Sequence, residues 1–242
     1  MNERPDDYET FSMFYDLEYD AIDDDLDFYR MFATQANGPI LELGCGSGRV
    51  LAALEEIGLP LQGIDTSGAM LQAARHRLTP DTHLIHADMR ELRPEMLAVA
   101  PVWMAFSAIN TFLHLQSVND QIAALTSIRS VLAEGGLLLL DLMTPDPGYL
   151  HGLHGHLQPE FSTVLHDGSR LDKWVSRTHD HASQTIETTV YFDVCSPDDG
   201  AVRRVVDRYL TRYATCRYPI RVSFAAGIII GNRPTTSPVF QG

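Results

Sequence analysis

Apolar runs alternate with helix-spaced apolar positions between residues 39 and 143. Short, continuously apolar segments predict buried strands at 39–43, 61–64, 82–86, 102–106 and 137–142. Between them, apolar residues recur every three or four positions, which predicts helices, one of them opening after the favourable N-cap Ser67. This alternation predicts an α/β fold with a doubly wound, mainly parallel Rossmann-like sheet.

The pattern changes after Pro145. Residues 144–160 are rich in Gly, Pro and His and show no periodicity. Beyond them, alternating apolar and polar positions predict antiparallel strands at 171–178, 185–194 and 202–213. We therefore expect a small antiparallel β cap to follow the parallel core.

The start of the chain is acidic and aromatic over Tyr8–Phe32, which predicts an N-terminal helical lid. These patterns divide the chain into four parts. They are a lid (1–34), a Rossmann-like core (35–143), an antiparallel substrate cap (144–215) and an atypical tail (216–242).

The composition is that of a globular protein, with 45% hydrophobic and 21% charged residues among 242. No run of about 18 apolar residues occurs, so we expect no membrane span. The N-terminus lacks the layout of a signal peptide. Cys45, Cys195 and Cys216 are widely spaced and form no CxxC, which favours a reducing cytoplasm over a disulfide framework or a zinc ribbon.

The net charge of −14 argues against a nucleic-acid partner. Lys173 is the sole lysine and stands in Asp-Lys-Trp, which excludes a Walker-type phosphate loop and disfavours a pyridoxal Schiff base. Residues 1–30 are strongly acidic, whereas residues 200–242 are basic. Two solvated faces would explain this asymmetry. The alternative is that the acidic segment docks near the basic one.

The motif with the clearest chemistry is Leu-Glu-Leu-Gly-Cys-Gly-Ser-Gly-Arg, residues 41–49, between a predicted strand and a predicted helix. Its glycines allow a sharp turn and a close approach of the backbone to a ligand, and the helix start offers free N–H groups. A dinucleotide fingerprint, G-x-G-x-x-G, would need a third glycine where Arg49 stands. The spacing is instead Glu42-x-Gly44-x-Gly46-x-Gly48.

Two further acids end neighbouring strands. Asp65 lies 21 residues after Gly44, where a carboxylate can accept hydrogen bonds from two ribose hydroxyls. Asp88 follows the third strand, where a carboxylate can accept a hydrogen bond from the exocyclic amine of an adenine. The Met89 N–H would then face a nitrogen of the adenine ring. Met70 would offer the adenine a soft apolar surface. Either acid could instead be a helix cap or a turn residue.

With these motifs in this order, residues 11–220 resemble the class I S-adenosylmethionine-dependent methyltransferases, close to the domain-25-like branch that acts on small molecules. Gly-Ile-Asp-Thr-Ser67, Ala-Asp-Met-Arg90 and the glycine pair before Asp141 carry the resemblance beyond the glycine loop. It implies S-adenosylmethionine as cofactor and S-adenosylhomocysteine as product. The implied cofactor-binding residues are Tyr15, Glu42, Gly44, Cys45, Gly46, Asp65, Thr66, Met70, Asp88, Met89 and Ser107.

The resemblance also assigns parts of the cofactor to these residues. Gly44, Cys45 and Gly46 would line its methionine part, and Asp65 would hold the ribose. Thr66 and Met70 would border the adenine, and Asp88 with Met89 would read its edge.

Reacting groups are expected where the fourth strand ends, at the ligand-binding edge of a doubly wound sheet. Ser107, Asn110 and His114 lie there, and the resemblance implies that an N-terminal segment with Tyr15 and Tyr19 closes over them. Since an acceptor hydroxyl needs a base, His114, titrating near neutrality, is the first candidate and Tyr15 the second. The predicted catalytic residues are thus His114, Tyr15 and Asn110. The alternative is a hydrogen-bonded structural histidine and packing tyrosines.

Other chemistries find little support. His151, His154 and His156 share one segment, but no Cys or carboxylate completes a ligand set, so we expect no metal. No Gly-x-Ser-x-Gly elbow occurs, which argues against a serine hydrolase.

The tail departs from the family pattern, in which a helix and a strand hairpin complete the sheet. Val222–Gly242 has no amphipathic helix and at most one strand, Ile228–Ile230, so the C-terminal hairpin is expected to be atypical or missing. A truncated or altered ending would explain this, as would a sheet edge covered by a partner chain in a homodimer.

The sequence thus predicts a cytoplasmic methyltransferase with a small-molecule acceptor and neither a nucleic-acid nor a membrane partner. Nitrogen is slightly preferred over oxygen as the acceptor atom, because the branch includes amine methylators. The alternative is a protein that binds S-adenosylmethionine or S-adenosylhomocysteine without turnover.

Overall fold

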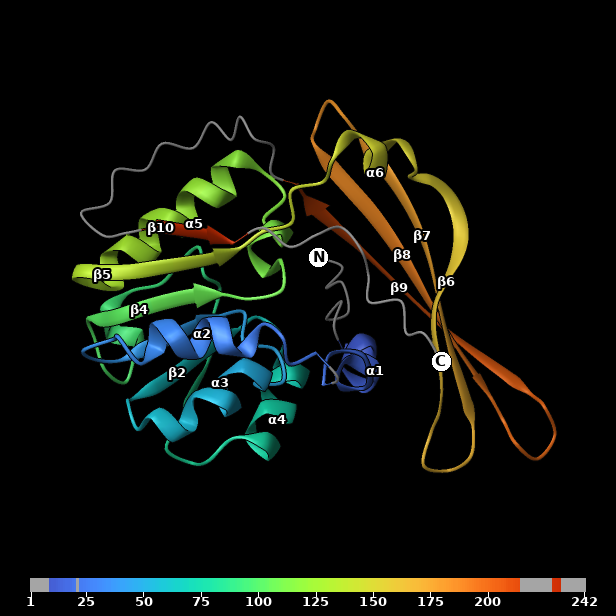
Figure 1. Ribbon diagram of the computed structural model, residues 1–242, viewed down its shortest axis with the longest axis horizontal. Coiled ribbons are helices and arrows are strands. Elements are labelled where there is room, and N and C mark those ends of the chain that lie inside the picture. The colour runs from blue at the N-terminus through green and yellow to red at the C-terminus, as the bar shows by residue number, and fades with distance from the viewer. Residues whose placement is uncertain (1–8, 21, 214–227, 232–242) are drawn as a thin grey trace, which may run out of the picture. The chain divides into compact units, whose positions relative to one another are not determined.

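The computed structural model describes residues 9–20, 22–213 and 228–231 (Figure 1). The chain divides into two compact units. The first runs through Leu142 and includes the strand at 228–231, and the second begins at Met143.

A parallel sheet forms the centre of the first unit. Its strands are β1 (Ile40–Leu43), β2 (Leu61–Asp65), β3 (His83–His86), β4 (Val102–Ser107), β5 (Leu132–Asp141) and β10 (Ile228–Gly231). They lie in the order β10-β5-β4-β1-β2-β3, and every neighbouring pair is parallel. The predicted doubly wound sheet is confirmed.

The helices of this unit are α1 (Glu9–Tyr19), α2 (Leu26–Ala33), α3 (Arg49–Leu54), α4 (Gly68–Arg77) and α5 (Val118–Val131), with short 3-10 helices at Glu55–Ile57, Pro94–Met96 and Thr111–His114. Ser67 caps α4 as expected, its Oγ accepting a hydrogen bond from the Met70 N–H at 3.3 Å. Figure 1 shows α2 and α3 on the same side of the sheet, where Tyr29 and Leu51 join Phe106 of β4 in one buried cluster.

The second unit is an antiparallel sheet. It contains α6 (Pro147–His151), β6 (His154–Val164), β7 (Arg170–Asp180), β8 (Thr185–Cys195) and β9 (Val202–Arg212), with the strands in the order β6-β7-β8-β9. The predicted antiparallel sheet is confirmed, with one strand more than the alternation indicated. β6 lies largely in the stretch without periodicity, because register shifts next to His154 and Pro159 break its alternation. Pro159 is tolerated because β6 is an edge strand.

The sole lysine has a structural environment in this second sheet. Lys173 is 3% exposed, and its Nζ lies 2.8 Å from Oε2 of Glu160. The same Nζ lies 5.9 Å from the ring centroid of Phe161 and 6.0 Å from that of Phe192. The ion pair and the two aromatic faces together compensate the burial of this charge.

β10 coincides with the one strand expected in the tail, and it pairs in parallel with β5 from Ile228 opposite Leu138. The remainder of the predicted tail, at 216–227 and 232–242, lies outside the described residues. Within the described ranges, no helix has both the length and the apolar character needed to cross a membrane.

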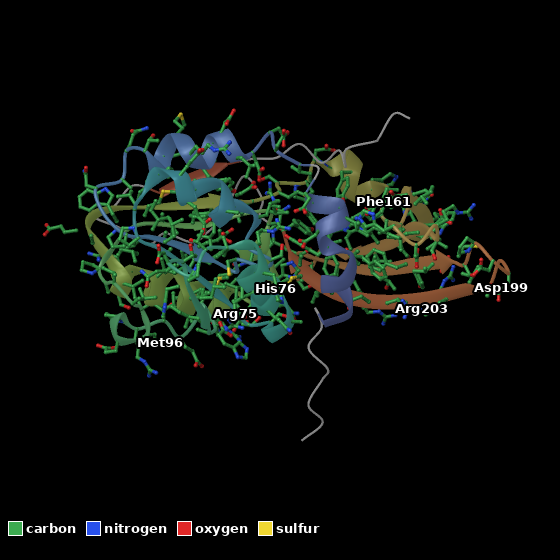
Figure 2. All side chains as sticks on the ribbon, turned by 90° about the horizontal axis from the view of Figure 1, so that it is seen from below. Arg75, His76, Met96, Phe161, Asp199 and Arg203 are labelled. Carbon is green, nitrogen blue, oxygen red and sulfur yellow. The ribbon has the colours of Figure 1, made fainter. Side chains whose placement is uncertain are left out.

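The acids of the N-terminal segment bind two arginines of the core. Arg49, at the start of α3, makes two bonds of 2.9 and 2.7 Å to the carboxylate of Asp25, and both side chains are less than a tenth exposed. Arg77 pairs with Asp16 at 3.0 Å and with Asp20 at 2.8 Å. Arg77 belongs to the basic last turn of α4, whose Arg75 and His76 are exposed (Figure 2). These acids therefore dock on core arginines, a pairing that the charge asymmetry did not indicate.

We expect Asp25→Ala to destabilise the first unit far more than Asp20→Ala. Removing Asp25 leaves the buried Arg49 guanidinium without its carboxylate partner, a change that costs about 3–5 kcal/mol. Arg77 and Asp20 are partly exposed, and such pairs contribute about 1 kcal/mol or less. Urea unfolding followed by circular dichroism compares the two variants, and equal losses would contradict the buried-pair interpretation.

Candidate functional site

A pocket lies at the carboxyl edge of the parallel sheet, where β1 has β4 on one side and β2 on the other. Open α/β sheets bind ligands at this point, because the chain connections leave a crevice there. Its lining residues are Tyr15, Glu42, Gly44, Cys45, Arg49, Val50, Ala108, Ile109 and Thr111. The first four belong to the predicted cofactor site.

The glycine loop takes backbone conformations that L side chains rarely adopt. Gly44, Gly46 and Gly48 have φ values of +69°, +52° and +80°. A Cβ atom on Gly44 would lie 2.2 Å from Cγ2 of Thr111, and one on Gly48 would lie 2.7 Å from Cδ1 of Leu78. The loop is therefore packed against the segment after β4 on one side and against the end of α4 on the other.

Asp65, at the end of β2, fixes the loop. Its Oδ2 accepts the Gly46 N–H at 2.8 Å, and its Oδ1 accepts the Ser67 N–H at 2.8 Å. Each carboxylate oxygen has two lone pairs. Asp65 therefore positions the glycine turn through two backbone N–H groups.

Glu42 and Ser107 are buried at the ends of β1 and β4 with polar atoms that have no partner. Glu42 is 2% exposed, and neither its Oε2 nor Oγ of Ser107 makes a hydrogen bond. Burial raises the pKa of Glu42 well above its usual range, although the charge of Arg49 opposes that shift. Two buried polar atoms left without partners at one sheet edge are typical of a binding site.

The lid brings an aromatic side chain over the loop. Tyr15 and Tyr19 of α1 stack with ring centroids 4.4 Å apart. The Tyr15 ring covers Gly46, since a Cβ atom built there would lie 3.8 Å from its Cε1. Burial raises the pKa of the Tyr15 phenol well above its ordinary value. Tyr15 stays protonated at neutral pH and can donate a hydrogen bond but is a poor base.

The glycine loop is also tied directly to the lid. Oγ of Ser47 lies 2.5 Å from Oδ1 of Asp16, one turn of α1 from Tyr19. The sequence analysis predicted neither this contact nor the three ion pairs that Arg49 and Arg77 make with the N-terminal acids. The only local signal was the presence of Arg49 where a dinucleotide loop has glycine, together with the density of acids before it.

Asp88 is already engaged by a cation. The Arg90 guanidinium contacts both carboxylate oxygens of Asp88, with Nε 3.0 Å from Oδ1 and Nη2 2.6 Å from Oδ2, and also reaches Asp120 at 2.8 Å. Hydrogen bonds and charge from Arg90 lower the pKa of Asp88, against the effect of partial burial. An adenine amine at Asp88 would share the carboxylate with this arginine.

The other residues predicted to border an adenine lie outside the pocket lining. Met70 is buried in α4 and Thr66 is exposed. Met89 is buried, and its carbonyl accepts a hydrogen bond from Ser127 Oγ. Gly46 is absent from the lining but lies under Tyr15.

His114 and Asn110 lie in the segment after β4 and outside the pocket lining. Burial lowers the pKa of His114 to about 4. The prediction that His114 titrates near neutrality is therefore wrong. The sequence alone did not indicate that the imidazole ring is desolvated in the folded protein. Ile109 and Thr111 line the pocket instead, and neither has a chemical signal in the sequence.

No metal centre is found among the residues that the structure describes. His151 and His154 have ring centroids 5.5 Å apart, and His154 and His156 are 6.3 Å apart. These rings pack edge to face on α6 and β6.

Known proteins similar to this chain are methyltransferases. Residues 40–136 match the methyltransferase domain family. Trans-aconitate 2-methyltransferase of Paracidovorax citrulli is 34% identical over 43% of this chain and 38% of its own length. Ubiquinone biosynthesis O-methyltransferase of Alkalilimnicola ehrlichii is 28% identical over 56% of this chain and 57% of its own length. The chain thus spans less than two thirds of these curated relatives.

The fold likeness extends further than the sequence likeness. The CcbJ methyltransferase of Streptomyces caelestis superimposes with a TM-score of 0.66 at 25% identity. That alignment covers 86% of this chain and 81% of the other. Both units of the present chain are therefore needed to account for it.

We expect Glu42→Gln to stabilise the protein at neutral pH. The raised pKa of Glu42 means that the folded state binds this proton more tightly than the unfolded chain does, so stability falls as pH rises above the unfolded pKa. The neutral amide removes that loss and should gain on the order of 1 kcal/mol. Thermal unfolding at several pH values measures the effect.

Glu55→Gln is the matched control. Its carboxylate accepts hydrogen bonds from Thr79 and Thr82, which lower its pKa against a small effect of burial. Its stabilising contribution is present above the unfolded pKa and is lost as pH falls, so the amide should destabilise. A Glu42→Gln protein less stable than wild type at pH 7 would contradict the assignment of a buried carboxyl group whose ionisation is costly.

Proposed function

Because the chain carries a class I methyltransferase domain in its first unit, we propose that it transfers the methyl group of S-adenosylmethionine to a small molecule. The observation that carries this proposal is the buried, unpartnered Oε2 of Glu42 beside the glycine turn. A buried acceptor without a donor costs free energy, and a cationic amino group of a ligand would remove that cost.

The charge of the pocket supports a cationic ligand rather than a dinucleotide. Arg49 is the one cation among its lining residues, and its guanidinium is held by Asp25 and by the carbonyl of Ile22. A pyrophosphate would face Glu42 and Asp65 with no cation left to receive it. The ammonium and sulfonium of S-adenosylmethionine suit the same carboxylates.

The residues at the strand ends fit the remaining parts of this cofactor. We propose that Gly44, Cys45 and Gly46 contact the methionine part and that Asp65 accepts the ribose hydroxyls with its remaining lone pairs. We propose further that the adenine lies against Thr66 and Met70. Its edge would then meet Asp88 and the backbone of Met89.

When bound, the cofactor supplies an activated methyl group, and the protein then has to align the acceptor and exclude water. We propose that the stacked Tyr15 and Tyr19 rings of the lid exclude water, because the Tyr15 ring covers Gly46. Asn110, Ser107 and His114 would orient the acceptor from the end of β4.

Nitrogen is the acceptor atom that this chemistry favours. A hydroxyl acceptor needs a base, but the pKa of His114 is lowered to about 4 and that of Tyr15 is raised. A neutral amine attacks without one. The named relatives include enzymes of other acceptors, such as trans-aconitate 2-methyltransferase, so the acceptor itself is identified only by assay.

The direct test is turnover. Purified protein should be stabilised by S-adenosylhomocysteine in thermal unfolding, show no shift with NAD, and add one methyl mass to a member of a panel of amine, hydroxyl and carboxylate metabolites. Asp65→Ala should weaken S-adenosylhomocysteine binding in calorimetry by tenfold or more, because the loop and the ribose lose one carboxylate.

Asp167→Ala is the matched control for that variant. Asp167 also accepts the N–H two residues ahead, that of Ser169 at 2.9 Å, but it belongs to the second unit and is not among the residues that line the pocket. Binding of S-adenosylhomocysteine without turnover of any acceptor would favour the alternative of a non-catalytic binding protein. No binding at all would overturn the proposal.

We expect the pH–rate profile for an amine acceptor to show no inflection that arises from protonation of a histidine. With a pKa of about 4, His114 stays neutral from about pH 5.5 to 8. The pH–rate profiles of wild type and His114→Gln should therefore run parallel in this range, with the variant lower throughout. An inflection near pH 6.5 that disappears in His114→Gln would show that the histidine acts as a base after all.

A further inference from the structure

The turn after β4 holds two consecutive side-chain-bearing residues in a strained conformation. Ile109 has φ = +45° and Asn110 has φ = +61°. Asparagine tolerates the left-handed region, but a β-branched residue there is a genuine outlier. Such conformations cost free energy and persist only where the surroundings enforce them.

A buried carboxylate on the neighbouring strand enforces this one. Asp141 ends β5, is 6% exposed, and accepts the Ile109 N–H with its Oδ2 at 3.2 Å. β4 and β5 are parallel, with Ser107 opposite Leu140, so their carboxyl ends meet. The hydroxyl of Tyr29 also points at Oδ2, at 3.5 Å. The bond to Ile109 therefore anchors the turn to the sheet.

The turn carries one wall of the pocket. Ile109 and Thr111 line it, and Cγ2 of Thr111 fills the space that only a glycine at position 44 leaves open. The following 3-10 helix, Thr111–His114, begins from Asn110 and carries His114. A change of φ at Ile109 would shift all of these side chains relative to the glycine loop.

We propose that Asp141 is a positioning residue for methyl transfer, which holds the strained Ile109–Asn110 turn so that the segment after β4 faces the glycine loop in the reactive arrangement. This inference rests on the proposed function. Asp141 acts through the backbone of Ile109 and need not touch the cofactor or the acceptor. Small displacements of such a segment can cost ten- to about a hundredfold in rate.

The test compares Asp141→Ala with Asp141→Asn in the full chain. The alanine variant should lower kcat/KM for the acceptor at least tenfold, while the affinity for S-adenosylhomocysteine in calorimetry stays within about twofold. Asn keeps an oxygen that can accept the Ile109 N–H, so it should restore most of the activity. Tyr29→Phe is the control, because it keeps the ring against Phe106 but loses the contact to Oδ2, and it should change kcat/KM less than twofold.

A second variant tests the proposal if Asp141→Ala does not fold. Glycine adopts positive φ without strain, so Ile109→Gly in the Asp141→Ala background should recover soluble protein and part of the turnover. No recovery in the double variant would overturn the proposal. So would equal losses of acceptor turnover and S-adenosylhomocysteine affinity, an Asn variant as impaired as the Ala variant, or an Ala variant with unchanged turnover.

Amide exchange separates this proposal from the proposed function. Hydrogen exchange at residues 108–111, followed by mass spectrometry, should be faster in Asp141→Ala than in Asp141→Asn or wild type, whether or not any acceptor is methylated. Unchanged exchange would refute the anchoring role even in an active enzyme. Faster exchange in a protein without methyl transfer would refute only the proposed function.

Discussion

The pairing of Arg49 with Asp25 is the interaction on which the charge of the site depends. Arg49 stands at the start of α3, within the pocket lining and near Glu42 and Tyr15. Asp25 holds its guanidinium with two bonds at under a tenth exposure, and burial keeps the pKa of Glu42 raised although the charge of Arg49 lowers it. The pair also joins the segment before α2 to the glycine loop. This buried ion pair thus contributes to both the charge of the pocket and the docking of the N-terminal segment, which Arg77 and Ser47 also bind.

The costs in this unit gather at one edge of the sheet. Glu42 and Ser107 have unpartnered polar atoms at the ends of β1 and β4. Ile109, two residues after β4 ends, has a strained positive φ. Elsewhere in the described part of this unit, β1 is buried along its whole length and α4 is capped by Ser67. Violations confined to one place are characteristic of functional sites, whose cost the surrounding core has to offset.

The sequence predicted what depends on local pattern. The positions of the strands, the Ser67 cap and the glycine turn depend on neighbouring residues, and these predictions are confirmed. The prediction that the strand at 82–86 is buried is wrong, because β3 is an edge strand whose end residues are exposed. β6 was missed because bulges disrupt its period, and the lid pairs were missed because Arg77 and Asp20 are 57 residues apart. The low pKa of His114 is equally non-local, since tertiary burial alone lowers it. Residue identity indicates which chemistry is available, whereas burial decides which protonation state is used.

The three acids predicted to face the cofactor illustrate that difference. Arg90 neutralises Asp88, and backbone N–H groups already engage both oxygens of Asp65. Glu42 alone keeps a buried oxygen without a donor. Discrimination between a cationic and an anionic ligand therefore falls on Glu42, next to the glycine turn. Asp65 and Asp88 can add hydrogen bonds that fix orientation, but their existing partners already offset part of their charge. The charge preference of the site is thus concentrated at the end of the pocket where β1 stops.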